Sequence, residues 1–190
     1  MNEPNPTIDP KRRNRNRIML LALFAIFLVP PIAAALLHAS GWRPAHTRNA
    51  GELLPQPIAL ADLDLRRADG AAFEWNRADR RWQAAVVATP DCGAACTELV
   101  AGLDKVWRLQ GRKADRFWVL WFGDVPEGIE TFRAFVPMQP DAQLAERLPD
   151  LPREGQPAVY LIDPAGFVAL RYAPGFDLAG LRKDVAQMLK

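Results

Sequence analysis

The sequence predicts an α/β domain with a central mixed sheet flanked by helices, preceded by an N-terminal transmembrane helix. Three observations support this prediction. A charge-free apolar stretch near the N-terminus, residues 18–37, is about as long as a membrane-spanning helix. Farther along, short apolar runs of strand length alternate with segments whose apolar residues recur at helical spacing. The last two strand-like runs are separated only by a tight turn, which predicts an antiparallel pair beside the parallel strands.

The 190-residue chain divides into four expected parts. They are a basic cytoplasmic tail (1–17), a transmembrane helix (18–38), a linker (39–57) and a folded domain (58–190). The tail carries five basic and two acidic residues, so the positive-inside bias places the N-terminus in the cytoplasm and the domain outside. A cleaved signal peptide is the alternative, but the apolar stretch exceeds the roughly 7–15 residues of a signal core.

The Arg- and Ala-rich composition fits a GC-rich bacterium. For a bacterial chain we expect one pass through the inner membrane and a domain in the periplasm, where two cysteines can form a disulfide. The formal net charge is only +2, and the tail accounts for the excess of basic residues. A near-neutral domain argues against binding of nucleic acid, which requires clustered Lys and Arg on the folded part.

The first half of the domain reads as strand, turn, strand, helix and strand. Residues 58–67 are a candidate strand, followed by a turn at Asp69-Gly70. The run at 81–89 is apolar on both faces, as in a central strand. Residues 96–111 have helical spacing, and 115–124 is another buried-strand run. Two strands joined through a helix are expected to be parallel.

The second half predicts a helix at 126–136, a short helix near 141–147, a hairpin within 156–174 and a C-terminal helix capped by Asp177. The hairpin turn, Asp163 to Gly166, has Pro in the second position and Gly in the fourth, as in a type I turn. This order of elements is the arrangement of the thioredoxin fold.

The only two cysteines, Cys92 and Cys96, lie between the central strand and the following helix. Helix N-terminal N–H groups lower a thiol pKa, and the thiolate is both the nucleophile and the metal ligand. Asp91 and Glu98 oppose this effect because nearby negative charge disfavours a thiolate. The pair is therefore a redox site, part of a metal site or a structural bridge. A bridge closing so short a loop would contribute little stability, which favours the first two.

The spacing "CGAAC" between a strand and a helix resembles the Sco family of cytochrome oxidase assembly proteins. The layout of tail, single anchor and exported thioredoxin-like domain resembles that family too, as does the late hairpin "VYLIDPAGFVALRY", 159–172. The resemblance implies that Cys92 and Cys96 act in thiol–disulfide exchange or hold Cu(I) transiently. It implies a cytochrome c oxidase subunit or another assembly factor as the partner.

The sequence departs from the Sco pattern at the third copper ligand. That family has a histidine just before the late hairpin, and the aligned position here falls near Gly155. The only two histidines are His38, at the edge of the membrane, and His46, in the linker, while Met138 is an isolated soft donor. The departure weakens copper delivery and leaves thiol–disulfide exchange better supported.

Pro157, just before the late strand, resembles the cis-proline that lies against the cysteines of thioredoxin-fold proteins and helps bind partner chains. We expect it to be cis, with a trans proline at the start of a strand as the alternative.

Under the exchange hypothesis, Cys92 is the attacking thiol and Cys96 resolves the mixed disulfide. Two other functions stay open: a general periplasmic thiol–disulfide oxidoreductase, and a non-catalytic membrane-tethered interaction domain with a structural disulfide.

Overall fold

The computed structural model describes residues 10–41, 49–151 and 155–190, and the chain divides into two compact units, 1–46 and 47–190. The first unit contains one helix, α1 (Pro10–Ala39), which continues through Pro30 and Pro31. Its segment from Arg13 to Ala39 is long and apolar enough to cross a membrane, and its large apolar side chains are exposed within the unit. Uncovered apolar side chains along a helix of this length match the requirements of a lipid environment.

The second unit is built on one six-stranded mixed sheet in the order β1-β6-β5-β2-β3-β4. β2 is parallel to β3, β3 is parallel to β4, and the pairs β2–β5, β5–β6 and β1–β6 are antiparallel. The strands are β1 (Glu52–Ala59), β2 (Trp82–Val87), β3 (Phe117–Phe122), β4 (Phe135–Met138), β5 (Ala158–Ile162) and β6 (Phe167–Tyr172). The predicted mixed sheet is confirmed.

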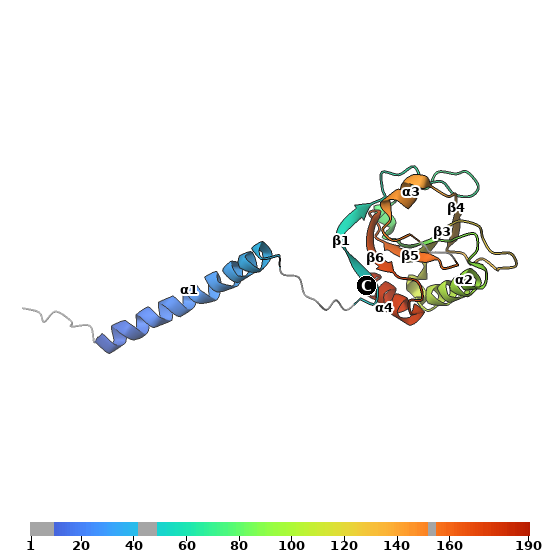
Figure 1. The fold of residues 1–190 in the computed structure, drawn as a ribbon. Helices are drawn as coiled ribbons and strands as arrows, with labels where there is room; N and C mark the ends of the chain where they lie inside the picture. The colour runs from blue at the N-terminus through green and yellow to red at the C-terminus, as the bar shows by residue number, and fades with distance from the viewer. Residues whose placement is uncertain (1–9, 42–48, 152–154) are drawn as a thin grey trace, which may run out of the picture. The chain divides into compact units, whose positions relative to one another are not determined.

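Helices cover both faces of the sheet (Figure 1). α2 (Gly93–Arg108) and α4 (Leu178–Met188) pack on one face, with Leu103 and Leu181 fully buried. The short α3 (Ala142–Arg147) packs on the other face together with the segment from Leu60 to Phe73. Two short 3-10 helices, Arg77–Asp79 and Gly111–Arg116, precede β2 and β3. The parallel β2–α2–β3 unit has the order predicted from the sequence.

β2 and β3 form the centre of the core because both are apolar on both faces. Phe117, Val119 and Trp121 of β3 belong to the cluster under α2 and α4. Leu120 and Phe122 belong to the opposite cluster, as the alternation of side chains along a strand requires. The carboxyl ends of these two neighbouring parallel strands meet at one edge of the sheet, and α2 starts from that edge.

The domain begins earlier than expected, since β1 starts at Glu52, inside the segment 39–57 taken as a linker. Pro55 and Pro57 hid this strand in the sequence. An edge strand tolerates proline, and β1 is an edge strand whose pairing with β6 is irregular between Leu53 and Ile58. The strand predicted at 58–67 is wrong beyond Ala59, where β1 ends. The predicted turn at Asp69-Gly70 is present, and an isolated β-bridge between Arg66 and Ala72 flanks it.

The helix predicted at 126–136 is wrong. The chain there forms turns and then enters β4 at Phe135, where it pairs with Val119 of β3. Gly128 has φ +74°, outside the helical region, and Phe132 and Phe135 are buried as separate contacts in the core under α2. Apolar spacing compatible with a helix arose here from side chains that enter the core from turns and a strand. The other two helices predicted for the second half of the domain, near 141–147 and after Asp177, are confirmed.

A buried carboxylate fixes the N-terminal end of the domain to its last helix. Asp184 of α4 is fully buried and accepts hydrogen bonds from the backbone N–H groups of Ala50 and Gly51, at 2.9 Å for the shortest of each. The Tyr172 hydroxyl donates to the same carboxylate at 2.8 Å. The approach is close, because a Cβ on Gly51 would lie 2.7 Å from the Tyr172 ring. We call these four residues the Asp184 clamp.

Candidate functional site

The two cysteines lie where β2 gives way to α2. β2 ends at Val87, a short loop follows, and Cys92 occupies the N-cap position of α2. Cys96 is in the first turn of the helix, and its N–H donates to the Cys92 carbonyl at 3.3 Å. The helix starts three residues before the position predicted, and this earlier start places both sulfurs at its N-terminal end. Helix N–H groups in that position favour a thiolate.

Cys92 and Cys96 form a disulfide, with their Cα atoms 5.4 Å apart, within the usual range for a bridge. Both belong to the core cluster under α2 and α4, and they differ in exposure: Cys92 is 7% exposed, whereas Cys96 is fully buried. Gly93, next to Cys92, is exposed, and a Cβ there would meet nothing within 4 Å. An incoming molecule therefore reaches the bridge from the side of Cys92.

Asp91 connects the cysteine loop to the loop before β5. The Thr89 side chain, and after it the Gly155 backbone, lower the pKa of the Asp91 carboxyl. The position near Gly155, where the resembling family carries its ligand histidine, thus lies beside the cysteine loop. Here it holds a glycine with φ +72°, a conformation that side-chain-bearing residues rarely adopt. The Asp91 carboxylate therefore lies beside the cysteines, close to the position where the Sco family carries its histidine and this chain carries none.

Pro157 is buried and directly precedes β5, as predicted, but the peptide bond before it is trans, so the predicted cis-proline is wrong. A trans proline fits because the residue before the strand needs no ladder N–H. With Ala95 and Leu99 of α2, and Phe176 before α4, Pro157 lines a hollow of about 250 Å³. The structure thus places it beside the first turn of α2, and its role in binding a partner stays a prediction.

The candidate metal donors do not converge in the described part of the chain. Met138 is packed in the cluster under α3, on the face of the sheet opposite the cysteines. His38 is exposed on α1, and His46 lies outside the described residues. Among residues 10–41, 49–151 and 155–190, no three His, Cys, Asp or Glu side chains are grouped to hold a metal ion. Two sulfurs joined in a bridge do not fit a copper site without reduction and a further donor.

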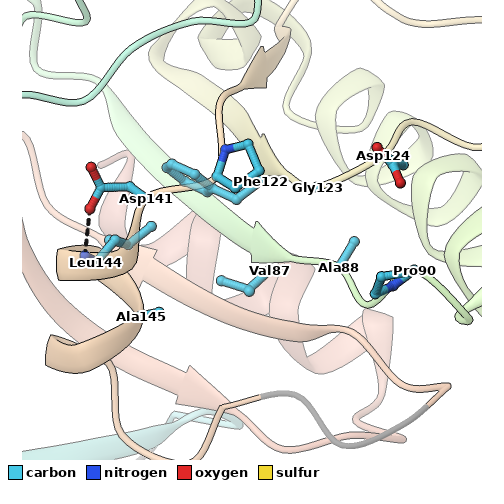
Figure 2. Close-up of a pocket in the computed structure, with 10 residues that line it drawn as sticks. Val87, Ala88, Pro90, Phe122, Gly123, Asp124, Asp141, Leu144 and Ala145 are labelled. Atoms are coloured by element: carbon cyan, nitrogen blue, oxygen red, sulfur yellow. Dashed lines mark hydrogen bonds between the residues drawn. The ribbon is translucent and has the colours of Figure 1, made fainter.

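The sequence did not reveal an apolar pocket at the carboxyl ends of β2 and β3, shown in Figure 2. It has a volume of about 300 Å³ and is closed on one side by α3. The loop that carries the disulfide supplies Pro90 to its wall, two residues before Cys92. No sequence signal could locate it, because its lining residues come from three separate segments. We call it the β2–β3 pocket.

A protein-family comparison matches a large part of the folded domain. The family described as transmembrane-like, thioredoxin-like, C-terminal domain matches residues 82–190, from the start of β2 to the end of the chain. The matched segment contains both cysteines, Pro157 and the β2–β3 pocket. No curated protein matches the chain.

Solved structures give further similarities. A SCO1/SenC family lipoprotein from Bacillus anthracis is 17% identical with a TM-score of 0.51, over 72% of this chain and 99% of its own. BsSco, described as a Sco-family cytochrome c oxidase assembly protein, is 14% identical with a TM-score of 0.50, over 73% and 97%. At such identities these two structures show a thioredoxin-like fold and nothing finer. Peroxiredoxin Q from Xanthomonas campestris is 20% identical with a TM-score of 0.49, over 73% and 97%.

Proposed function

Because the chain belongs to the transmembrane-like, thioredoxin-like C-terminal domain family, we propose that it exchanges its Cys92–Cys96 disulfide with cysteines of a partner protein. One observation carries the proposal: the bridge lies at the N-terminus of α2, just after the central strand, with Cys96 fully buried and Cys92 slightly exposed, at 7%. This asymmetry defines which sulfur is attacked and which one leaves.

The exchange proceeds in two balanced steps. A partner thiolate attacks Sγ of Cys92, the bond between the two Sγ atoms breaks, and Cys96 leaves as a thiolate that takes a proton from water. A second partner thiolate then attacks the partner's own sulfur in the mixed disulfide and releases Cys92 as a thiolate. The partner dithiol has lost two electrons and the Cys92–Cys96 pair has gained them. The same steps in reverse reduce a partner disulfide.

The N-terminal helix supports a membrane-anchored form of this activity. We propose that α1 spans the membrane once with the basic tail inside, which puts the cysteines in the oxidising periplasm of a bacterial cell. Protease added to spheroplasts should then digest the domain from outside while the membrane stays intact. A domain that is protected until the membrane is opened would reverse the orientation.

For the partner, we propose the cysteines of a cytochrome c oxidase subunit or of another assembly factor. The support is the resemblance in sequence layout described above, together with the cysteine pair. Cells carrying Cys92→Ser and Cys96→Ser should lose oxidase activity when copper is limiting. Normal oxidase activity in that strain would remove the oxidase from the proposal and leave a general thiol–disulfide oxidoreductase.

Trapping of the mixed disulfide tests the exchange itself. The full chain in detergent, carrying Cys96→Ser, is mixed with a model peptide that contains a disulfide. We expect a covalent complex through Cys92, detected by mass, because the resolving thiol is absent. The matched Cys92→Ser variant should trap far less, since Cys96 is fully buried. Equal trapping by the two variants, or none by either, would contradict the assigned roles.

A further inference from the structure

We propose that the β2–β3 pocket receives an apolar side chain of the partner polypeptide, next to a basic residue, while the partner's cysteine reacts with Cys92. This inference rests on the proposed exchange and specifies what the partner looks like around its cysteine. The pocket lies apart from the hollow beside Pro157, with which it shares no lining residue.

The floor of the pocket is apolar, and a close approach of two backbone segments shapes it. Val87 and Phe122, the last residues of β2 and β3, line it together with Leu144 and Ala145 of α3 (Figure 2). Gly123 keeps the two loops close, because a Cβ there would lie 2.9 Å from the Ala88 carbonyl oxygen. A volume of about 300 Å³ is at the small end for ligand sites, which suits a side chain better than a large cofactor.

A short stretch of chain connects the pocket wall to the disulfide. Ala88 and Pro90 line the pocket, and Cys92 follows two residues later at the start of α2. Crevices outside the carboxyl ends of parallel strands are the usual binding places in open α/β sheets. A polypeptide bound with its cysteine at Cys92 therefore passes along this loop.

Charge specifies the partner further. Residues 88–98, which are the loop after β2 and the beginning of α2, and the loop 123–131 after β3 together contain five acidic residues and neither Lys nor Arg. Two aspartates line the pocket itself, Asp124 and Asp141, although the Asp141 carboxylate already caps α3 by accepting from the Leu144 N–H at 2.7 Å. Glu130 also interacts with Arg108 of α2. With Asp91 held ionised, the rim repels an acidic segment and attracts a basic one.

The test uses the full chain in detergent and synthetic peptides with one cysteine, which reduce the bridge by the first step above. The parent peptide has Leu and Lys two and three residues before its cysteine, and matched peptides have Ser for Leu or Glu for Lys. We expect the Leu peptide to react about tenfold faster than the Ser peptide, from partial burial of the side chain. The Lys peptide should react about threefold faster than the Glu peptide at low salt, and this difference in rate should shrink as the salt concentration rises.

Two substitutions in α3 localise the effect. Ala145→Leu fills the pocket and should bring the Leu peptide close to the rate of the Ser peptide. Ala142→Leu makes the same change at an exposed position of the same helix that does not line the pocket, and should keep the preference. Asp124→Asn should reduce the preference for Lys over Glu.

The outcomes distinguish a failure of the pocket proposal from a failure of the proposed thiol–disulfide exchange. If the bridge reacts with dithiothreitol and with all peptides at equal rates, exchange stands and the pocket proposal is overturned. A preference for Leu that survives Ala145→Leu also overturns it. If no thiol reduces the bridge in the folded protein, both the pocket proposal and the exchange fall together.

Discussion

The disulfide and the Asp184 clamp both hold a helix in place, but they join very different parts of the chain. The bridge links residues four apart, Cys92 and Cys96, at the start of α2. The clamp links Ala50 to Asp184, 134 residues farther along, through hydrogen bonds alone. A short covalent loop removes little entropy from the unfolded chain, whereas the clamp closes the domain on itself. The covalent link is thus the weaker candidate for a purely structural role, and the hydrogen-bonded one is the stronger.

Removing the clamp carboxylate should have the largest effect on stability. Asp184→Ala leaves the buried Gly51 N–H and the Tyr172 hydroxyl without their acceptor, so we expect the free energy of unfolding to fall by about 3 kcal/mol. Urea denaturation of the full chain in detergent, followed by tryptophan fluorescence, measures the change. Lys183→Ala, at the exposed neighbouring position of α4, is the control and should change little. If Asp184→Ala lowered the free energy of unfolding by less than about 1 kcal/mol, the Asp184 clamp would not be a main source of stability.

Removing the bridge should cost less. For a loop of this length the entropic contribution is about 2 kcal/mol, so Cys92→Ala with Cys96→Ala should lower the unfolding free energy by no more than that. The same variant should lose thiol exchange completely. The comparison would be reversed if the double variant were destabilised more than Asp184→Ala, or failed to fold where Asp184→Ala still folds.

Tyr172→Phe sharpens the comparison by removing one hydrogen bond of the clamp and keeping the ring. We expect a loss of about 1.5 kcal/mol at neutral pH, since the bond is made to a carboxylate. Burial, followed by the hydrogen bond and the charge of Asp184, raises the pKa of the Tyr172 hydroxyl.

The raised pKa of Tyr172 also predicts an alkaline effect. The stabilisation is fully present below the unfolded-state pKa of about 10 and is lost as pH rises above it, because the unfolded chain releases the proton first. The slope is up to about 1.4 kcal/mol per pH unit for one tyrosine. Unfolding curves between pH 9 and 11 should show a steeper decline in the parent than in Tyr172→Phe. Parallel declines would contradict the clamp geometry.

The sequence correctly predicted the elements whose local residue pattern fits only one kind of secondary structure. The apolar runs of β2 and β3, the capped α4 and the β5–β6 hairpin all fall where expected, and with them the thioredoxin-like fold. The strand-to-helix position of Cys92 and Cys96 followed directly from that order.

The remaining features depended on contacts between distant segments. β1 was hidden because prolines argue against a strand unless the strand is known to lie at an edge. The spacing of Ile129, Phe132 and Phe135 matched a helix, although Phe135 instead pairs along β3. The buried contacts of Asp184 could not be predicted, since its partners include backbone N–H groups that carry no sequence signature. The trans bond at Pro157 likewise has no local signal.

The reduction potential of the Cys92–Cys96 pair is the decisive measurement for the proposed thiol–disulfide exchange. The folded full chain in detergent is equilibrated with glutathione or dithiothreitol buffers, then alkylated and weighed by mass spectrometry. We predict reversible two-electron exchange with a potential above about −300 mV. We also predict that Cys92 is alkylated before the fully buried Cys96 once the pair is reduced. A potential well below that value, or a bridge reduced only after the domain unfolds, would make the disulfide structural and contradict the exchange function.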